Sequence, residues 1–196
     1  MIKETLFATP IYVFDNLLDQ SQNQQVEQAI LKWSQEDPGV QKTNVNGWHS
    51  KDNMYEKQEF TLLTQKLFEA QFSIYQEEGL NGEPVLGNMW ANINPKYGYN
   101  KSHNHANSLW SGVYYVKAPE QSGTLYLEDP RTASTMVVPK YNKQKHSYQW
   151  STVTYEPMVG RCIMFPSSLR HGVNMNQSED NRISVSFNFI QERKNK

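Results

Sequence analysis

Cysteine is almost absent from this sequence, which contains a single such residue, Cys162, among 196. One thiol cannot form an internal disulfide, so a disulfide-stabilised scaffold is excluded and a reducing compartment is expected. Cys162 opens the apolar run Cys162-Ile163-Met164-Phe165, where we predict that it packs as a small buried hydrophobic side chain.

Excess charge of either sign is also lacking. Lys and Arg number 19 and Asp and Glu number 20, which gives a formal net charge of -1. Proteins that bind nucleic acid or anionic membranes use a marked excess of positive charge, so neither is expected as a partner here.

Long hydrophobic runs are missing as well. The first residues, Met1 to Thr5, are followed by no long apolar stretch, so no signal peptide is predicted. No segment comes near the roughly 20 apolar residues that a membrane-spanning helix needs. We therefore expect a cytoplasmic protein.

The apolar residues that are present suffice for one core. Hydrophobic residues make up 37% of the chain and charged residues 20%, which is typical of a globular domain. A chain of 196 residues is too short for two well-packed domains, so we predict one domain over residues 1–196. Aromatic residues reach 12%, which favours a β-rich fold because flat rings pack well on pleated sheets.

The hydrophobic periodicity changes along the chain. Residues 6–14 predict an opening edge strand that tolerates Pro10, and helical spacing predicts two helices, one capped by Asp19 and ending near Pro38, the other over residues 60–77. Short β-rich segments separated by turn residues follow at 86–94, 109–117, 123–128, 135–138, 150–156, 161–166 and 182–190. This pattern predicts a mainly β jelly-roll core at residues 85–190, with N-terminal helices from residues 1–84 packed on one of its sheets.

Three of the five histidines have a spacing that suits a metal ion. In His103-Asn104-His105 the two imidazoles are two residues apart, and residues i and i+2 of an extended chain face the same side. His171 lies 66 residues beyond His105, after an apolar segment, and could complete a facial site from a second strand. A single histidine is more often a surface or hydrogen-bonded core residue, and that reading is kept for His49 and His146.

The last predicted strand alternates between apolar and polar residues without a break. Ile183, Val185, Phe187 and Phe189 share one face, and Arg182, Ser184, Ser186 and Asn188 share the other. A polar face on a central strand must contact solvent or a wet pocket. Because a guanidinium binds a carboxylate with two hydrogen bonds and a hydroxyl adds a donor, Arg182 and Ser184 are candidates for a carboxylate site. A plain solvent-facing edge strand is the alternative.

Taken in order, several motifs resemble the Fe(II)/2-oxoglutarate-dependent oxygenase superfamily, in its prolyl-4-hydroxylase-like branch, and above all small 2OG-Fe(II) oxygenases of bacteria and phages. The resemblance covers about 100 residues, from Asn88 to Ile190. It is carried by His103-Asn104-His105, Ser111-Gly112-Val113-Tyr114-Tyr115, Gly123 to Arg131, Phe165-Pro166-Ser167, His171-Gly172-Val173 and Arg182-Ile183-Ser184.

The resemblance implies a double-stranded β-helix and a set of site residues. His103 and His171 would be iron ligands, with His105 as the third, and Arg182, Ser184 and Tyr115 would hold the distal carboxylate of the co-substrate 2-oxoglutarate. Tyr115 could equally be a packed strand aromatic, and Asn92 could line the same pocket. No catalytic residue beyond the metal centre is expected.

The third ligand position departs from the family pattern, which usually has Asp or Glu where this chain has His105. Three neutral imidazoles can bind Fe(II), but they also suit zinc. Asp129 is a candidate for a supporting carboxylate, although a turn residue before Pro130 is the more ordinary reading.

The function that the resemblance implies is an Fe(II)- and 2-oxoglutarate-dependent dioxygenase. It would hydroxylate an unidentified substrate, either a small molecule or a protein side chain, with release of succinate and CO2. We expect a monomer or a homodimer. Two alternatives stay open, namely a three-histidine zinc hydrolase or hydratase and a catalytically silent jelly-roll binding module. A carboxylate anchor at Arg182 favours the oxygenase over the hydrolase, and three histidines favour it over the silent module.

Overall fold

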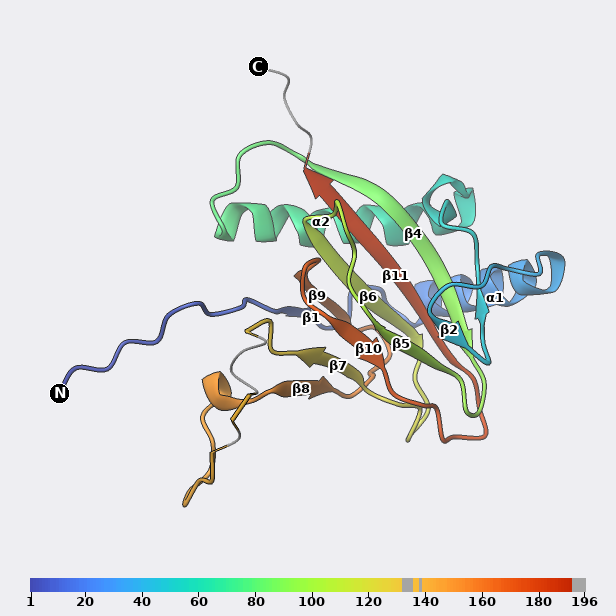
Figure 1. Cartoon of the computed structure of the whole chain (residues 1–196). Coiled ribbons are helices and arrows are strands. Elements are labelled where there is room, and N and C mark those ends of the chain that lie inside the picture. Colours follow the sequence, from blue (N-terminus) through green and yellow to red (C-terminus); the bar gives the residue numbers. More distant parts are fainter. Residues whose placement is uncertain (132–135, 138, 192–196) are drawn as a thin grey trace.

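The computed structural model describes residues 1–131, 136–137 and 139–191, and in this part of the chain two antiparallel sheets face each other (Figure 1). The larger sheet has six strands in the order β1-β9-β6-β11-β4-β3. Their bounds are β1 Tyr12–Phe14, β9 Cys162–Pro166, β6 Trp110–Lys117, β11 Arg182–Gln191, β4 Pro84–Asn94 and β3 Trp48–His49. The long central strand β11 pairs with β6 on one side and with β4 on the other.

The smaller sheet has five strands in the order β2-β5-β10-β7-β8. These are β2 Asn44–Val45, β5 Tyr99–His103, β10 His171–Val173, β7 Leu125–Glu128 and β8 Thr152–Tyr155. Successive strands of the chain alternate between the sheets from β4 to β6 and from β9 to β11. This alternation is the arrangement of a double-stranded β-helix, which confirms the predicted fold class.

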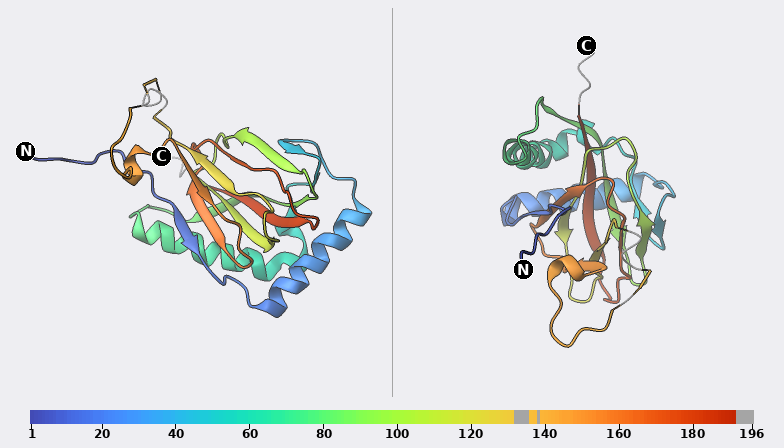
Figure 2. Two further views of the ribbon diagram at one scale, coloured as in Figure 1. Left: turned by 90° about the horizontal axis from the view of Figure 1, so that it is seen from below. Right: turned by 60° about the vertical axis from the view of Figure 1, so that its left-hand side comes forward.

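Two helices cover the outer face of the six-stranded sheet (Figure 2). Helix α1, Gln20–Glu36, packs on β6, and helix α2, Thr61–Glu77, packs on β4. Asp19 caps α1, as predicted, because its carboxylate accepts from the Gln22 N–H at 2.8 Å and the Gln22 side chain accepts from the Asp19 N–H. Short 3-10 helices at Met54–Glu56 (η1), Gln58–Phe60 (η2) and Ser147–Gln149 (η4) complete the described helical elements.

The side chains of β11 alternate between the two faces of the six-stranded sheet, and an apolar layer lies on each side of that sheet. The apolar face of β11 is buried between the sheet and the helices, with Phe187 and Phe189 fully inaccessible. A smaller cluster between the two sheets contains Val113, Tyr115 and Phe165. Cys162 is fully buried in the first layer, as predicted, and burial raises the pKa of its thiol.

Some of the predicted segments were wrong or incomplete. The opening strand covers only Tyr12–Phe14, because Pro10 lacks a backbone donor and Phe7 has a φ of 61°, so residues 6–11 run as an extended arm outside the sheet. Strands β5 and β10 were not predicted. The predicted segment 135–138 lies largely outside the described residues. No helix in the described ranges combines the length and apolar character needed to cross a membrane.

Candidate metal and co-substrate site

The three predicted histidines meet between the sheets. His103 ends β5 and His171 begins β10, and the two residues lie directly opposite each other in the antiparallel pair. His105 follows β5 in a short connection whose position is fixed by the His105 N–H donating to the Ser167 carbonyl at 3.0 Å. One nitrogen of each imidazole lies within 4.8 Å of the others, so the group could hold one metal ion.

Backbone carbonyls orient two of the rings. His103 Nδ1 lies 2.7 Å from the Lys101 carbonyl oxygen, and His171 Nδ1 lies 2.9 Å from that of Leu169. A carbonyl oxygen can only accept a hydrogen bond, so Nδ1 carries the proton in both rings and Nε2 keeps its lone pair. This tautomer leaves Nε2 free to bind a metal ion.

Burial keeps these imidazoles neutral. Burial, and to a smaller extent the neighbouring His103, lowers the pKa of His171 to about 3 and that of His105 to about 4. The pKa of His103 is also lowered, mainly by burial. Neutral imidazole is the form that binds metal, so at neutral pH no proton competes for the site.

The ring of His105 is held by aromatic contacts. Its centroid lies 5.7 Å from that of Trp90, on β4, and Trp90 in turn stacks on His49 at 5.4 Å with an interplanar angle of 10°. His49 therefore approaches the site through Trp90 and is not part of the ligand group. Trp90 lines the histidine cavity and was missed from the sequence, although it shares a strand face with Asn92.

Arg182, the first residue of β11, is almost fully buried, at 1% exposed. Its Nη1 donates to three backbone carbonyls, those of Ser122, Gly123 at 3.2 Å and Asn174 at 3.3 Å. Its buried Nη2 has no hydrogen-bond partner, and no carboxylate in the described part of the chain forms an ion pair with it. Burial lowers the pKa of Arg182 to about 10, so the side chain remains a cation at neutral pH.

The other predicted co-substrate residues lie beside Arg182. Ser184 is opposite Tyr115 on β6 and opposite Asn92 on β4. The Tyr115 hydroxyl and the Asn92 Oδ1 are both buried without a partner. All four side chains line the same cavity as the three histidines. An anionic ligand with an acceptor at this end would satisfy Arg182 and Tyr115 together, so the residues present fit a carboxylate.

Asp129 lies elsewhere. It forms two 2.9 Å hydrogen bonds with the guanidinium of Arg131 and does not belong to the histidine group. The backbone carbonyls that hold Arg182 could not be found from the sequence, because a peptide carbonyl is present at every position.

Fold and site together define a double-stranded β-helix protein with a cluster of three histidines between its sheets that could hold a metal ion. Residues 88–188, just over half of the chain, match the family described as "Putative 2OG-Fe(II) oxygenase". The chain belongs to this family, whose members are Fe(II)- and 2-oxoglutarate-dependent oxidoreductases, and the predicted resemblance is confirmed. None of the curated proteins has a matching sequence.

Solved structures share the fold at low sequence identity. A Pseudomonas putida prolyl-4-hydroxylase aligns with a TM-score of 0.68 and 12% identity over 93% of both chains. A Trichoplax adhaerens prolyl hydroxylase in complex with a hypoxia-inducible factor peptide aligns with a TM-score of 0.66 and 16% identity, over 92% of this chain and 83% of that one. The epimerase SnoN in complex with Fe3+, α-ketoglutarate and a nogalamycin compound aligns with a TM-score of 0.68 and 10% identity, over 92% and 78%.

Proposed function

We propose that this protein is a dioxygenase that uses Fe(II) and 2-oxoglutarate to hydroxylate a bound substrate, releasing succinate and CO2. In this proposal His103, His105 and His171 hold the metal. Four further side chains hold the co-substrate, namely Arg182, Ser184, Tyr115 and Asn92. When bound, iron with 2-oxoglutarate and O2 supplies the oxidising power, and the protein supplies binding, orientation and exclusion of water.

The observation that carries the proposal is the buried guanidinium of Arg182 in the histidine cavity. Burying a cation without a counter-ion destabilises a protein by roughly several kcal/mol, because the charge loses its hydration. A dicarboxylic oxo acid relieves this cost with one carboxylate and still presents its other end to the histidines. Hydrolysis or hydration at a three-histidine zinc site requires no such anchor, so the arrangement favours the oxygenase.

The residues divide the binding task. Arg182 is locked in position by three carbonyls before any ligand arrives, so little conformational entropy is lost when it binds a carboxylate. Phe165 packs edge-on against His171 with centroids 4.6 Å apart and, with Trp90, provides an apolar wall beside the metal ligands. Such a wall limits water access and strengthens the electrostatic contacts inside.

The test is an anaerobic titration of the metal-free protein with Fe(II) followed by 2-oxoglutarate. A weak visible charge-transfer band that saturates at one equivalent of each is the expected result. Zinc bound at one equivalent, with no band and no 2-oxoglutarate binding by calorimetry, would contradict the proposal and favour a hydrolase. Failure to bind any metal would favour a silent binding module.

A further inference from the structure

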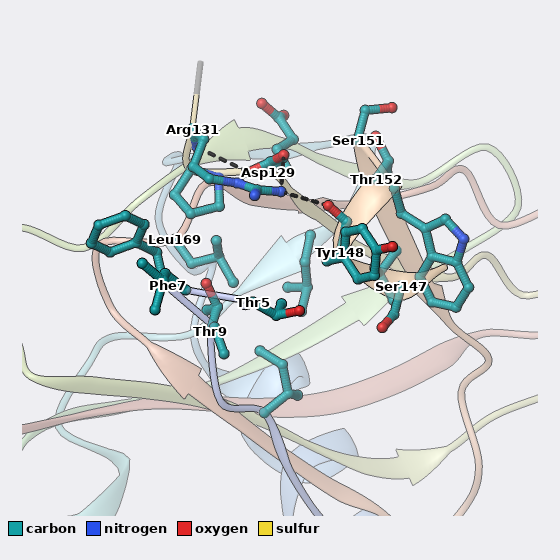
Figure 3. A pocket seen from close by; sticks show the side chains of 18 of the residues that line it. Thr5, Phe7, Thr9, Asp129, Arg131, Ser147, Tyr148, Ser151, Thr152 and Leu169 are labelled. Carbon is teal, nitrogen blue, oxygen red and sulfur yellow. Dashed lines mark hydrogen bonds and ion pairs between the residues drawn. The ribbon is translucent and has the colours of Figure 1, made fainter. Parts of the chain in front are cut away.

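A second cavity, of about 340 Å³, opens beside the histidine cavity and shares no lining residue with it. Figure 3 shows its walls: the N-terminal arm with Thr5, Phe7 and Thr9 on one side, and the connection between β7 and β8 on the other. Lys3 donates to the Tyr148 hydroxyl and lies 4.3 Å from the centre of its ring, which ties the arm to that connection.

This cavity reaches the metal ligands through a single layer of residues. Leu169 lines it, and the Leu169 carbonyl accepts from His171 Nδ1 at 2.9 Å. Leu127 also lines it and lies opposite His171 in the pairing of β10 with β7. The cavity therefore lies behind His171, on the side of the ring that faces away from Nε2.

Strand β8 offers a free edge at the cavity. It is the last strand of the five-stranded sheet. The Asp129 N–H donates to the Ser151 carbonyl at 2.9 Å, and hydrogen-bonded pairs alternate along an antiparallel ladder. The peptide groups of Thr152 and Thr154 therefore face away from β7, and β8 pairs with no second strand among the described residues. An unpaired edge of this kind accepts an extended chain as an added strand.

The connection beside β8 is basic. Its described residues, 130–131, 136–137 and 139–150, include Arg131, Lys140, Lys143 and Lys145 and no acidic residue, although the whole chain carries a net charge of -1. The three lysines are exposed, and none forms an ion pair with a residue that the structure describes.

The carboxylates that line the cavity do not cancel this positive charge. Glu128 lies 3.6 Å from the guanidinium of Arg170, and Asp129 lies 2.9 Å from that of Arg131. Each is therefore matched by an arginine, which leaves the lysines to attract an acidic partner.

The rim of the cavity is apolar. Phe7 is 85% exposed and Trp150 is 42% exposed, and Figure 3 shows Phe7 beside Leu169 at the mouth. Exposed aromatic side chains around a cavity of this size suit an apolar anchor residue of a partner.

We propose that β8 and the basic connection bind an extended, acidic segment of a protein, which adds to the free edge of β8 and places an apolar side chain in the cavity. The unpaired peptide groups of β8 favour a polypeptide over a nucleic acid, because only a polypeptide can continue the ladder.

A random 12-residue peptide display library, selected on the metal-free protein, identifies the class of ligand. Enrichment of acidic peptides with alternating apolar residues is the expected result. Binding of the enriched peptides is then measured by fluorescence anisotropy. Replacing Lys140, Lys143 and Lys145 together by Glu should weaken it by at least about tenfold, because complementary charge steers and holds such partners.

Two controls make this test specific. The control variant replaces Lys32 in α1, Lys57 between η1 and η2 and Lys66 in α2 by Glu and should bind the peptides as the parent does. Two N-methylated forms of the bound peptide are compared, one methylated at its odd-numbered residues and the other at its even-numbered residues. Only one of the two forms should lose binding, because only one of these sets of N–H groups faces β8.

The proposal is overturned if no peptide is enriched, if the triple variant at positions 140, 143 and 145 binds the enriched peptides normally, or if a 15-nucleotide oligothymidine binds and acidic peptides do not. Peptide binding is measured without metal or co-substrate, so its failure is separate from failure of the anaerobic titration. Peptide binding by a protein that does not bind 2-oxoglutarate would retain the docking site and remove the oxygenase assignment.

Discussion

Tyr115→Phe is the substitution that most sharply tests the co-substrate pocket. Tyr115 is 1% exposed, its hydroxyl has no partner in the described residues, and burial raises its pKa to about 12, so it is a neutral donor at neutral pH. Phenylalanine keeps the packed ring and removes only the hydroxyl. Stability and affinity should therefore respond in different directions.

The expected changes in 2-oxoglutarate affinity and in stability follow from the absence of a hydrogen-bond partner for the Tyr115 hydroxyl among the described residues. A hydrogen bond to a carboxylate contributes about 1.5–3 kcal/mol, so losing it should weaken 2-oxoglutarate binding by about 10- to 150-fold. The free energy of unfolding of the metal-free protein should not fall and could rise by up to about 1–3 kcal/mol, because an unpaired buried hydroxyl is removed. Affinity is measured by calorimetry on the Mn(II) form without oxygen, and stability by urea unfolding.

Tyr114→Phe is the matched control. The Tyr114 hydroxyl donates to Asn23 Oδ1 at 2.7 Å on the opposite face of β6. This variant should lose about 0.5–1.5 kcal/mol of stability and keep its 2-oxoglutarate affinity. Unchanged affinity in Tyr115→Phe would refute the contact with the co-substrate. A clear loss of stability there would mean that the hydroxyl has a partner within the protein.

Four further predictions concern the same site. Arg182→Ala should weaken 2-oxoglutarate binding by about tenfold to several hundredfold with iron affinity nearly unchanged, and Arg182→Lys should recover only part of it; equal calorimetric affinity in all three proteins would contradict the anchor. His171→Ala and His103→Ala should each abolish stoichiometric iron in metal analysis, while circular dichroism shows a retained fold. The His105→Asp variant should still bind Fe(II). If metal analysis instead found no iron in this variant, the site would require a third imidazole. The pKa of His171 is lowered to about 3, so its contribution to stability is present above pH 6.5 and is lost as the pH decreases; between pH 6.5 and 5 this residue alone should cost the metal-free protein about 2 kcal/mol, in addition to the loss from His105, whose pKa is lowered to about 4. The same loss in urea unfolding of His171→Asn would exclude His171 as the cause.

The sequence predicted the helices and strands whose apolar residues recur with a clear periodicity. The alternation in the last strand located β11 to within one residue, and helical spacing located both helices. The strands that carry the histidines, β5 and β10, were missed, because one is polar and the other has three residues. Their extended conformation comes from pairing with neighbouring strands, which no local pattern records.

The environment of Arg182 shows a second limit. Its polar strand face predicted a pocket, and Arg182 does line a cavity, but the sequence did not show that the guanidinium is buried under the carbonyls of Ser122, Gly123 and Asn174. The carbonyls of Ser122 and Gly123 come from a turn about 60 residues earlier and that of Asn174 from only 8 residues earlier, and no sequence pattern indicates that any of them binds Arg182. The resemblance to a family supplied the role of Arg182, and the structure supplied the physical reason for it.

The pairing of His103 with His171 has a consequence for folding. The two imidazoles face each other across neighbouring strands that are distant in the sequence. An ion shared by them is a reversible cross-link that closes the long chain segment between them, and it restricts the unfolded chain much as a covalent bridge does. The short strands β5 and β10 would then open together when the metal leaves. Amide hydrogen exchange in these strands should therefore report metal occupancy, whereas exchange in β11 should report global unfolding.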